Sequence, residues 1–494
     1  MMYSNCLRVL KRTRLVWVSI LFYIAVYGIM FIPHYSIDSY TIWLDLTEFV
    51  RAPISSGRLV FALWGWLFCW LNFNPVQCQW IGVLLFILSL ALSHILLYKS
   101  FLRLFPLETS KYKKVALWLS VGVIFCNPFI GEWFYFVETS VVYATALTFC
   151  ALAVQQITKK KTRNWIFAFL YVVIAVNSYQ AIVSNFLILG AIYFLIENRF
   201  RWSWPSFWSV VGVVVMSAIA SMTALLCAKI IPALAGMEGR FSEVSIWENI
   251  KYIISCQAPL WKSGLRLMLG YWLIVAFVLC MAVVVMQLCM KKEWMGLAWT
   301  MVVLTGCYLS SFLVHYVNSE HWIVPRTMVP FFCFIAVAFI CAIWLWPDQK
   351  RYSAVATGLI LIFVFGCGFQ VIRVTCQQIQ TNQMDKNEIL QIDEAIRTYE
   401  KENDVQITKC TISTDQYITY VYPQITLFSG EVGERILSVK WAAVDAIEFY
   451  TGRTLQELPA PEEITERFSQ YDWGELNVSE QLVFEGDTVH ICVY

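Results

Sequence analysis

The stretch Gly270–Met290 reads GYWLIVAFVLCMAVVVMQLCM and contains no charged residue. A helix needs roughly 20 such residues to cross the hydrocarbon core of a bilayer. A second stretch without a charge extends from Pro205 to Ala228. These long apolar runs predict a protein that spans a membrane.

The composition of the whole chain supports this prediction. Of the 494 residues, 59% are hydrophobic and only 14% are charged, and the mean hydropathy is +0.62. A soluble domain carries about 25% charged residues, so a water-soluble fold could not hide this much apolar surface. The N-terminus is basic and leads into an apolar run without a small-residue cleavage site, which predicts an uncleaved first span.

The apolar runs along the chain predict an all-α bundle of eleven membrane-spanning helices. Their approximate ranges are 15–33, 80–98, 115–131, 139–157, 165–177, 181–196, 206–229, 268–290, 294–316, 327–346 and 353–372. The apolar segment Leu59–Phe73 is short for a span and rich in Trp. We interpret it as a helix that lies in the membrane interface.

This assignment places most of the Lys and Arg residues in alternate short loops. The loops concerned are Arg8–Arg14, Lys99–Lys114, Lys159–Arg163, Arg199–Arg201, Lys291–Lys292 and Lys350–Arg351. Cytoplasmic loops carry the excess of Lys and Arg in membrane proteins. We therefore predict a multi-pass protein of a bacterial plasma membrane, with a cytoplasmic N-terminus and an extracytoplasmic C-terminal segment.

Residues 373–494 differ from the rest of the chain. From Thr381 onward acidic residues outnumber basic ones more than twofold, although the whole chain has a net charge of +2. Periodicity predicts helices over Ile389–Lys401 and Val439–Tyr450, a strand over Val405–Ile412, and a hairpin of Leu482–Phe484 with Thr488–Val493. The sequence thus divides into a transmembrane domain, 1–372, and a small acidic extracytoplasmic α/β domain, 373–494. A basic membrane body with an acidic tail argues against a nucleic-acid partner.

Polar residues in the outer loops are the candidates for function. Charged groups near a bilayer are costly and usually have a reason. The residues we single out are Asp38, Arg58, Glu132, Glu138, Tyr179, Gln180 and Arg326. Structural roles remain open for them: an interfacial aromatic belt with helix-capping acids, a solvated loop cation, a simple turn, or an arginine that extends to the interface.

The order of these residues resembles the Gtr-type serotype-converting glucosyltransferases. The chain shows an acid after the first span, Gly57-Arg58 before the interfacial helix, and Asn127-Pro-Phe-x-x-Glu132, then Tyr179-Gln180 and Pro325-Arg326. The resemblance covers roughly residues 15–345. Two positions depart from that family: Asp38 is followed by Ser39-Tyr40 rather than by a second acid, and Glu138 stands where an Asp is more typical.

The resemblance implies a GT-C-like fold, in which a helical membrane bundle carries its active site on the outer face. It also implies transfer of a sugar, glucose by analogy, from a polyprenyl-phosphate donor to a cell-envelope glycan acceptor. A lipid-linked donor brings its own carrier, so the Gly-rich loop of a nucleotide site is not required. The lipid bilayer is then both the solvent of the protein and the source of its donor.

Such a reaction needs a general base and cations for the leaving phosphate. On the resemblance, we assign Asp38 as the base, with Glu132 as the alternative base or as an acid that orients the acceptor. Arg58 and Arg326 are the candidates for the donor phosphate. Glu138, Tyr179 and Gln180 are expected to bind the sugar or the acceptor. The acids could instead hold Mg²⁺ or Mn²⁺ through oxygen ligands, and the sequence leaves the metal open.

Other functions remain as alternatives. A transporter or flippase of lipid-linked saccharides should show repeated halves and ionisable or broken segments at mid-membrane depth. The predicted spans are poor in such charges, and the sequence contains no evident repeat. A glycan polymerase or ligase would share the topology, and a receptor would work through its acidic tail.

Overall fold

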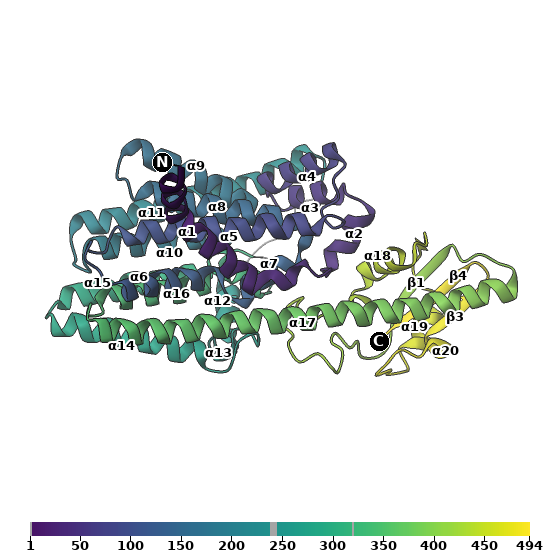
Figure 1. Ribbon diagram of the computed structural model, residues 1–494. Helices are drawn as coiled ribbons and strands as arrows, with labels where there is room; N and C mark the ends of the chain where they lie inside the picture. Colours follow the sequence, from purple (N-terminus) through teal and green to yellow (C-terminus); the bar gives the residue numbers. More distant parts are fainter. Residues whose placement is uncertain (1, 238–244, 319–320) are drawn as a thin grey trace.

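The computed structural model describes residues 2–237, 245–318 and 321–494. It shows an elongated molecule with a helical bundle at one end and a small α/β domain at the other (Figure 1). One very long helix, α17 (Lys350–Asn403), runs through both parts. The fold class predicted from hydropathy and periodicity is therefore confirmed in outline.

Six helical segments of the described chain are long and apolar enough to cross a membrane. They are Thr13–Phe31 at the end of α1, α5 (Gln79–Leu102), Val137–Ile157 with α8 (Ser140–Ile157), α11 (Trp204–Leu234), α14 (Trp272–Met290) and α17. The other predicted spans fall on helices of 15 to 17 residues. These are α6 (Lys111–Phe125), α9 (Thr162–Ser178), α10 (Ile182–Glu197), α15 (Trp294–Ser310) and α16 (Val329–Leu345). Helix length supports six spans in the described chain, and eleven stays a prediction.

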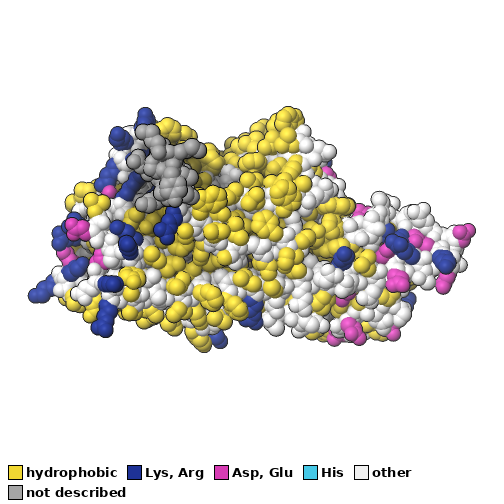
Figure 2. Space-filling model, in the orientation of Figure 1, with side chains coloured by type: hydrophobic (Ala, Val, Ile, Leu, Met, Phe, Trp, Pro, Cys, Tyr) yellow, Lys and Arg dark blue, Asp and Glu magenta, His cyan; other side chains and the backbone are white. Residues whose placement is uncertain are grey.

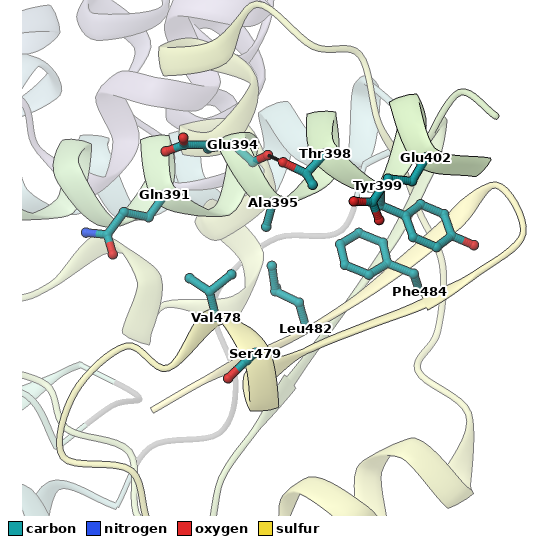
Figure 3. Close-up of a pocket in the computed structure, with 10 residues that line it drawn as sticks. All are labelled: Gln391, Glu394, Ala395, Thr398, Tyr399, Glu402, Val478, Ser479, Leu482 and Phe484. Atoms are coloured by element: carbon teal, nitrogen blue, oxygen red, sulfur yellow. Dashed lines mark hydrogen bonds between the residues drawn. The ribbon is translucent and has the colours of Figure 1, made fainter. Parts of the chain in front are cut away.

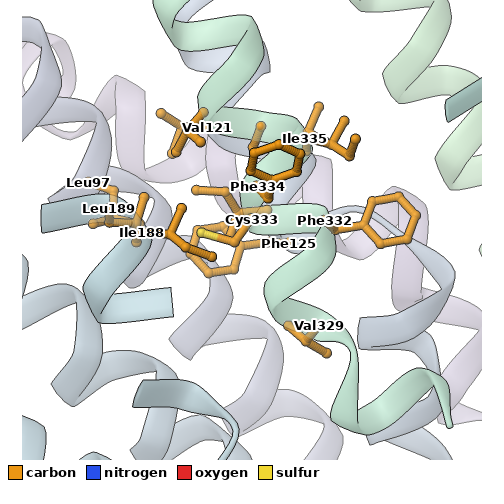
Figure 4. Close-up of a cluster of buried hydrophobic side chains, with 14 of the residues drawn as sticks. Leu97, Val121, Phe125, Ile188, Leu189, Val329, Phe332, Cys333, Phe334 and Ile335 are labelled. Carbon is orange, nitrogen blue, oxygen red and sulfur yellow. The ribbon is translucent and has the colours of Figure 1, made fainter. Parts of the chain in front are cut away.

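Helix α16 lies at the centre of the bundle. All but one of its residues are buried, because α6, α10, α14 and α15 surround it. Figure 4 shows Phe125 of α6 and Ile188 of α10 beside Cys333 and Phe334 of α16. A helix that is apolar on every side is one that is buried on every side.

The predicted span 115–131 is broken rather than straight. Helix α6 ends at Phe125, and α7 (Pro128–Tyr135) leaves it at an angle of 44°. The Asn127 side chain accepts two backbone N–H groups of α7 at 3.1 Å and donates to two backbone carbonyls of α6 at 3.0 Å. One amide thus satisfies both helix ends inside an apolar environment, which makes the break tolerable. The break sets the position of Glu132 on α7.

Short helices cover the bundle end that faces the C-terminal domain. They are α2 (Ile37–Leu44), α3 (Glu48–Ser55), α4 (Leu59–Leu71), α12 (Ile246–Ser255) and α13 (Gln257–Ser263). Helix α4 coincides with the predicted interfacial helix and packs on α3 through ring contacts of Phe49. Its Trp66 and Trp70 are exposed, as an interfacial helix requires. Its depth in a membrane stays a prediction.

Helix α17 joins the bundle to the C-terminal domain without a break. Its 54 residues give a length of about 80 Å. The predicted last span, 353–372, and the predicted helix Ile389–Lys401 are two parts of this one helix. The domain boundary expected at residue 372 therefore falls inside α17.

The sheet of the C-terminal domain has the strand order β2-β1-β4-β3. Strand β1 (Lys409–Thr414) is parallel to β2 (Gln456–Glu457) and β4 (Thr488–Val493), and β3 (Leu482–Glu485) forms the predicted hairpin with β4. Strand β1 begins later than the expected 405–412. Helix α18 (Lys440–Thr451) confirms the second predicted helix, and α19 (Glu462–Phe468) and α20 (Val478–Gln481) complete the domain.

The C-terminal domain is docked onto the bundle through α18 and α2 (Figure 1). Thr41 of α2 donates a hydrogen bond to Asp445 of α18. The hydroxyls of Tyr40 and Tyr450 lie 3.2 Å apart, and Phe449 contacts the aromatic rings of α2. The two parts therefore share an interface at one end of the bundle.

Basic side chains are unevenly distributed over the surface of the molecule. Figure 2 shows Lys and Arg gathered at the bundle end away from the C-terminal domain, with hydrophobic side chains between that end and the domain. At this Lys/Arg-rich end lie the loops that contain Arg103, Lys114, Lys160, Arg201, Lys292 and Arg351, and several of these loops are joined by Lys160–Glu197, Arg201–Glu293 and Ser110–Asp348 contacts. The loops predicted to be cytoplasmic are thus together in space, and the C-terminal domain lies at the opposite end.

Candidate functional site

Five of the predicted site residues meet at the bundle end that faces the C-terminal domain. Arg58 precedes α4, Glu132 lies on α7, Tyr179 and Gln180 connect α9 to α10, and Arg326 lies in the 3-10 turn Pro325–Thr327. Hydrogen bonds and ring contacts join all five. We call these five residues the arginine group.

Both the backbone and the side chain of Arg326 are fixed by contacts. Glu132 accepts a hydrogen bond from its backbone N–H and another, of 3.2 Å, from its Nη1. The guanidinium lies over the rings of Phe136 and Trp322, with Cζ at 4.6 and 4.8 Å from the ring centroids. Trp133 donates to the Arg326 carbonyl oxygen at 2.8 Å. These contacts fix the orientation of a cation whose side chain is only 13% exposed.

Arg58 is positioned by a tight turn. Gly57 has φ +69°, and a Cβ there would lie 2.3 Å from Cα of Ala228 on α11. The close approach of this turn to α11 therefore requires a glycine. Arg58 Nε donates to Gln180 Oε1 at 2.8 Å, and Gln180 Nε2 donates to the Ser56 carbonyl at 3.1 Å. Gln180 thus orients a cation rather than standing in an open turn.

Tyr179 connects the two arginines. Arg58 lies over its ring at 5.3 Å, and its hydroxyl donates to the Arg326 carbonyl oxygen at 3.3 Å. The ring also packs edge-on against Trp133 and Tyr143. Burial raises the pKa of Tyr179 to about 12, so the phenol stays protonated and remains a hydrogen-bond donor.

A residue outside the predicted set completes this group. Arg326 Nη2 donates to Oε1 of Glu431, from the C-terminal domain, at 2.7 Å. Burial disfavours the charge on Arg326, but Glu431 and Glu132 outweigh it and raise its pKa above the ordinary value. The run Gly430-Glu431-Val432-Gly433 signals a tight turn. Nothing in the sequence connects that turn with Arg326, which is 105 positions away.

The other two predicted acids lie together in a second group. Glu138 is buried in the 3-10 turn Val137–Thr139 and accepts hydrogen bonds from Ser39 at 2.8 Å and Ser36 at 3.3 Å. Asp38 is exposed in the first turn of α2, close enough to repel the Glu138 charge. We call these four residues the Asp38 group. The structure thus divides the predicted acids between two sets of partners.

The described residues do not assemble a metal site. In the ranges 2–237, 245–318 and 321–494, no three His, Cys, Asp or Glu side chains are placed to hold one ion. Glu132 uses its oxygens on Arg326, and Glu138 uses its oxygens on two serines. This donor set does not fit Mg²⁺ or Mn²⁺, which need several oxygen ligands together.

An open cavity of about 720 Å³ lies in the C-terminal domain, away from both groups. Figure 3 shows it between α17 and the β3 and α20 segments. Its lining includes the stacked rings of Tyr399 and Phe484 and the acids Glu394 and Glu402. None of the predicted site residues lines it.

The family model for glucosyl transferase GtrII matches residues 16–343. The chain belongs to this family. No curated protein and no solved structure gives a match. The matched range contains all seven predicted site residues and ends before α17, so Glu431 lies outside it. Family membership and the apolar helices together support a membrane-embedded glucosyltransferase, and the resemblance stated from the loop motifs is confirmed.

Proposed function

We propose that this GtrII-family protein transfers a glucosyl group from a polyprenyl-phosphate carrier to a cell-envelope glycan at the outer face of the plasma membrane. The observation that carries the proposal is the pairing of Arg58 and Arg326 across Tyr179. Two fixed arginines at one end of an apolar bundle suit the phosphate of a membrane lipid.

The arginines serve the leaving group. When the acceptor hydroxyl oxygen attacks the anomeric carbon, the bond from that carbon to the phosphate oxygen breaks. The carrier phosphate keeps the electron pair and gains negative charge. Planar guanidinium groups match phosphate oxygens and stabilise that charge. Gln180 and Tyr179 hold the two cations in place before the reaction, so little reorganisation is needed.

Asp38 is the proposed general base, which takes the proton of the acceptor hydroxyl. Its exposure leaves it accessible to a glycan, whereas Glu132 is bound to Arg326 at two places. Glu132 would have to give up this pairing with Arg326 in order to take a proton. Glu138 accepts hydrogen bonds from two residues of the α2 region. It thereby positions α2, which carries Asp38, and contributes to acceptor binding through that helix.

The outer-face assignment follows from the separation of charge. The Lys/Arg-rich end of the bundle corresponds to the cytoplasm under the positive-inside rule. Both groups of site residues lie at the opposite end, beside the C-terminal domain. A lipid-linked donor and an envelope glycan would meet on that side.

The test is transfer by the purified full chain in liposomes that contain polyprenyl-phosphate-glucose and an envelope glycan acceptor. We expect labelled glucose to reach the glycan from this donor and not from a nucleotide sugar. Use of the nucleotide sugar alone would disprove the donor. Movement of the lipid-linked sugar across the bilayer without transfer would identify a flippase, and joining of whole glycan blocks a polymerase or ligase. Linkage analysis of the envelope glycan, with and without the gene, identifies the product.

A further inference from the structure

The turn Ser429–Val432 of the C-terminal domain is built into the arginine group. Ser429 and Val432 exchange backbone hydrogen bonds of 3.3 and 3.1 Å, which closes the turn. Gly430 has φ +61°, and a Cβ there would lie 2.7 Å from the side chain of Val324. The turn therefore lies against the segment that leads into Arg326.

Helix α17 holds this turn from the other side. Gln378 accepts the backbone N–H of Gly433 at 2.8 Å, and Gln377 accepts that of Leu427 at 2.9 Å. Both glutamines lie on α17, between the bundle and the sheet. The turn is thus a formed structural element that presents Glu431 at its tip to Arg326.

Two carboxylates share the guanidinium of Arg326, and they are held differently. Glu132 accepts from both the backbone and the side chain of Arg326, and its own side chain is 1% exposed. Glu431 accepts one hydrogen bond, comes from another domain and is 17% exposed. Of the two, Glu431 is the carboxylate that a ligand could replace.

We propose that Glu431 occupies the phosphate-binding position on Arg326 while no donor is bound. When the donor binds, its phosphate displaces Glu431 from Arg326. This inference rests on the proposed function, in which Arg326 holds that phosphate. A carboxylate and a phosphate offer a guanidinium the same pair of oxygen atoms. A phosphodiester carries one negative charge, as does Glu431, so the exchange leaves the net charge around Arg326 unchanged. Glu431 thereby lowers the apparent affinity of the donor site.

The proposal predicts that loss of the Glu431 charge lowers the donor KM, whereas loss of a purely structural contact would not. A ligand that must displace an internal competitor binds with an apparent affinity reduced by the fraction of competent sites. Glu431→Gln keeps the size of the side chain and removes its charge, so the donor KM should fall about three- to tenfold. The kcat should not change, because Glu431 has already left Arg326 in the donor complex.

The experiment measures KM and kcat for polyprenyl-phosphate-glucose with the full chain in liposomes. Glu457→Gln, an exposed acid on β2 of the same domain, is the matched control and should change neither constant. The inhibition constant of free polyprenyl phosphate is measured in parallel and should fall with KM in Glu431→Gln. A KM that rises or stays the same, or a lower kcat in protein that melts at the wild-type temperature, overturns the proposal.

The two proposals fail in different ways. Wild-type protein that transfers no glucose from this donor would overturn the proposed function. Wild-type protein that transfers glucose, with a Glu431→Gln variant that shows no gain in affinity for donor or free carrier phosphate, overturns only the role of Glu431. If Glu431→Gln misfolds, Glu431→Asp provides the second variant. Its shorter side chain weakens the contact at 2.7 Å, and the donor KM should again fall.

Discussion

The arginine group and the Asp38 group lie at the same end of the bundle, yet they are built in opposite ways. Arg326 and Glu132 are enclosed by aromatic rings and ion pairs. Asp38 is exposed, beside the interface of α2 with the C-terminal domain. A cation that must hold a phosphate gains from enclosure, because electrostatic attraction is stronger away from water. A base that must reach a glycan has to stay accessible.

The largest effect is expected on the Asp38 side of this comparison. Asp38→Asn keeps the size of the side chain but cannot accept a proton at neutral pH. We expect transfer to fall about 10²- to 10⁴-fold, the usual cost of losing a general base. Glucose transfer per molecule of membrane-inserted protein is the measurement, with thermal unfolding to show that the fold is intact.

Glu132→Gln tests whether Glu132, rather than Asp38, is the general base. It removes one of the two carboxylates that pair with buried Arg326, so its main effect should be a loss of stability. Because Glu431 remains paired with Arg326, that loss should be smaller than the roughly 3–5 kcal/mol of a fully unpaired buried charge. Asp45→Asn and Glu48→Gln are controls, because both acids lie in the same loop region and accept hydrogen bonds from nearby Thr47 and Arg51. Near-full turnover by Asp38→Asn together with inactive but folded Glu132→Gln would move the base to α7.

A smaller effect is expected on the arginine side. Arg58→Ala removes a charged group from the proposed phosphate site, and a hydrogen bond to a charged group contributes about 1.5–3 kcal/mol. The donor KM should therefore rise about ten- to 100-fold. Arg51→Ala is the matched control, since Arg51 lies on the adjacent α3 and forms a surface ion pair with Glu48 at 3.1 Å. Equal KM values for the two variants would show that Arg58 does not bind the donor.

Hydropathy predicted the location of most helices because burial in lipid demands long apolar runs. It could not predict that α6 and α7 are separate, since Asn127 and Pro128 look like a normal interruption at the end of a span. It also could not predict the continuity of α17. The apolar part of that helix and its polar part have different compositions, yet the backbone hydrogen bonds continue through both.

The sequence indicated candidate site residues where they follow one another along the chain, as in Gly57-Arg58 and Tyr179-Gln180, and their role in a site stays a prediction. The partners of each residue were not. Arg58 binds Gln180, 122 positions away, and Arg326 binds Glu431 across a domain interface. Only the folded chain shows that Glu132 is buried and bound to Arg326, whereas Asp38 lies at the surface.

Gly57→Ala tests whether the position of Arg58 depends on the close packing of the Gly57 turn against α11. Gly57→Ala places a side chain at φ +69° and against the backbone of α11. Gly452→Ala has the same φ of +69°, and no described atom lies within 4 Å of its Cβ position. Both variants should lose about 1–2 kcal/mol through backbone strain. Thermal unfolding should show a larger loss for Gly57→Ala, and only that variant should raise the donor KM. Equal losses would mean that the turn tolerates displacement.

The smallest effect is expected where the two arginines are linked. Tyr179→Phe keeps the ring against Arg58 and Trp133 and removes only the hydroxyl that donates to the Arg326 carbonyl. A neutral hydrogen bond contributes about 0.5–1.5 kcal/mol, so the donor KM should rise about two- to tenfold. Tyr352→Phe, exposed at the Lys/Arg-rich end, is the control for the substitution itself.

The informative measurement is the double variant Tyr179→Phe with Arg58→Ala. If Tyr179 serves only to hold the backbone of Arg326, the two changes should add in free energy. A combined loss smaller than the sum would show instead that the hydroxyl acts through Arg58, and that the two arginines bind one phosphate as a unit.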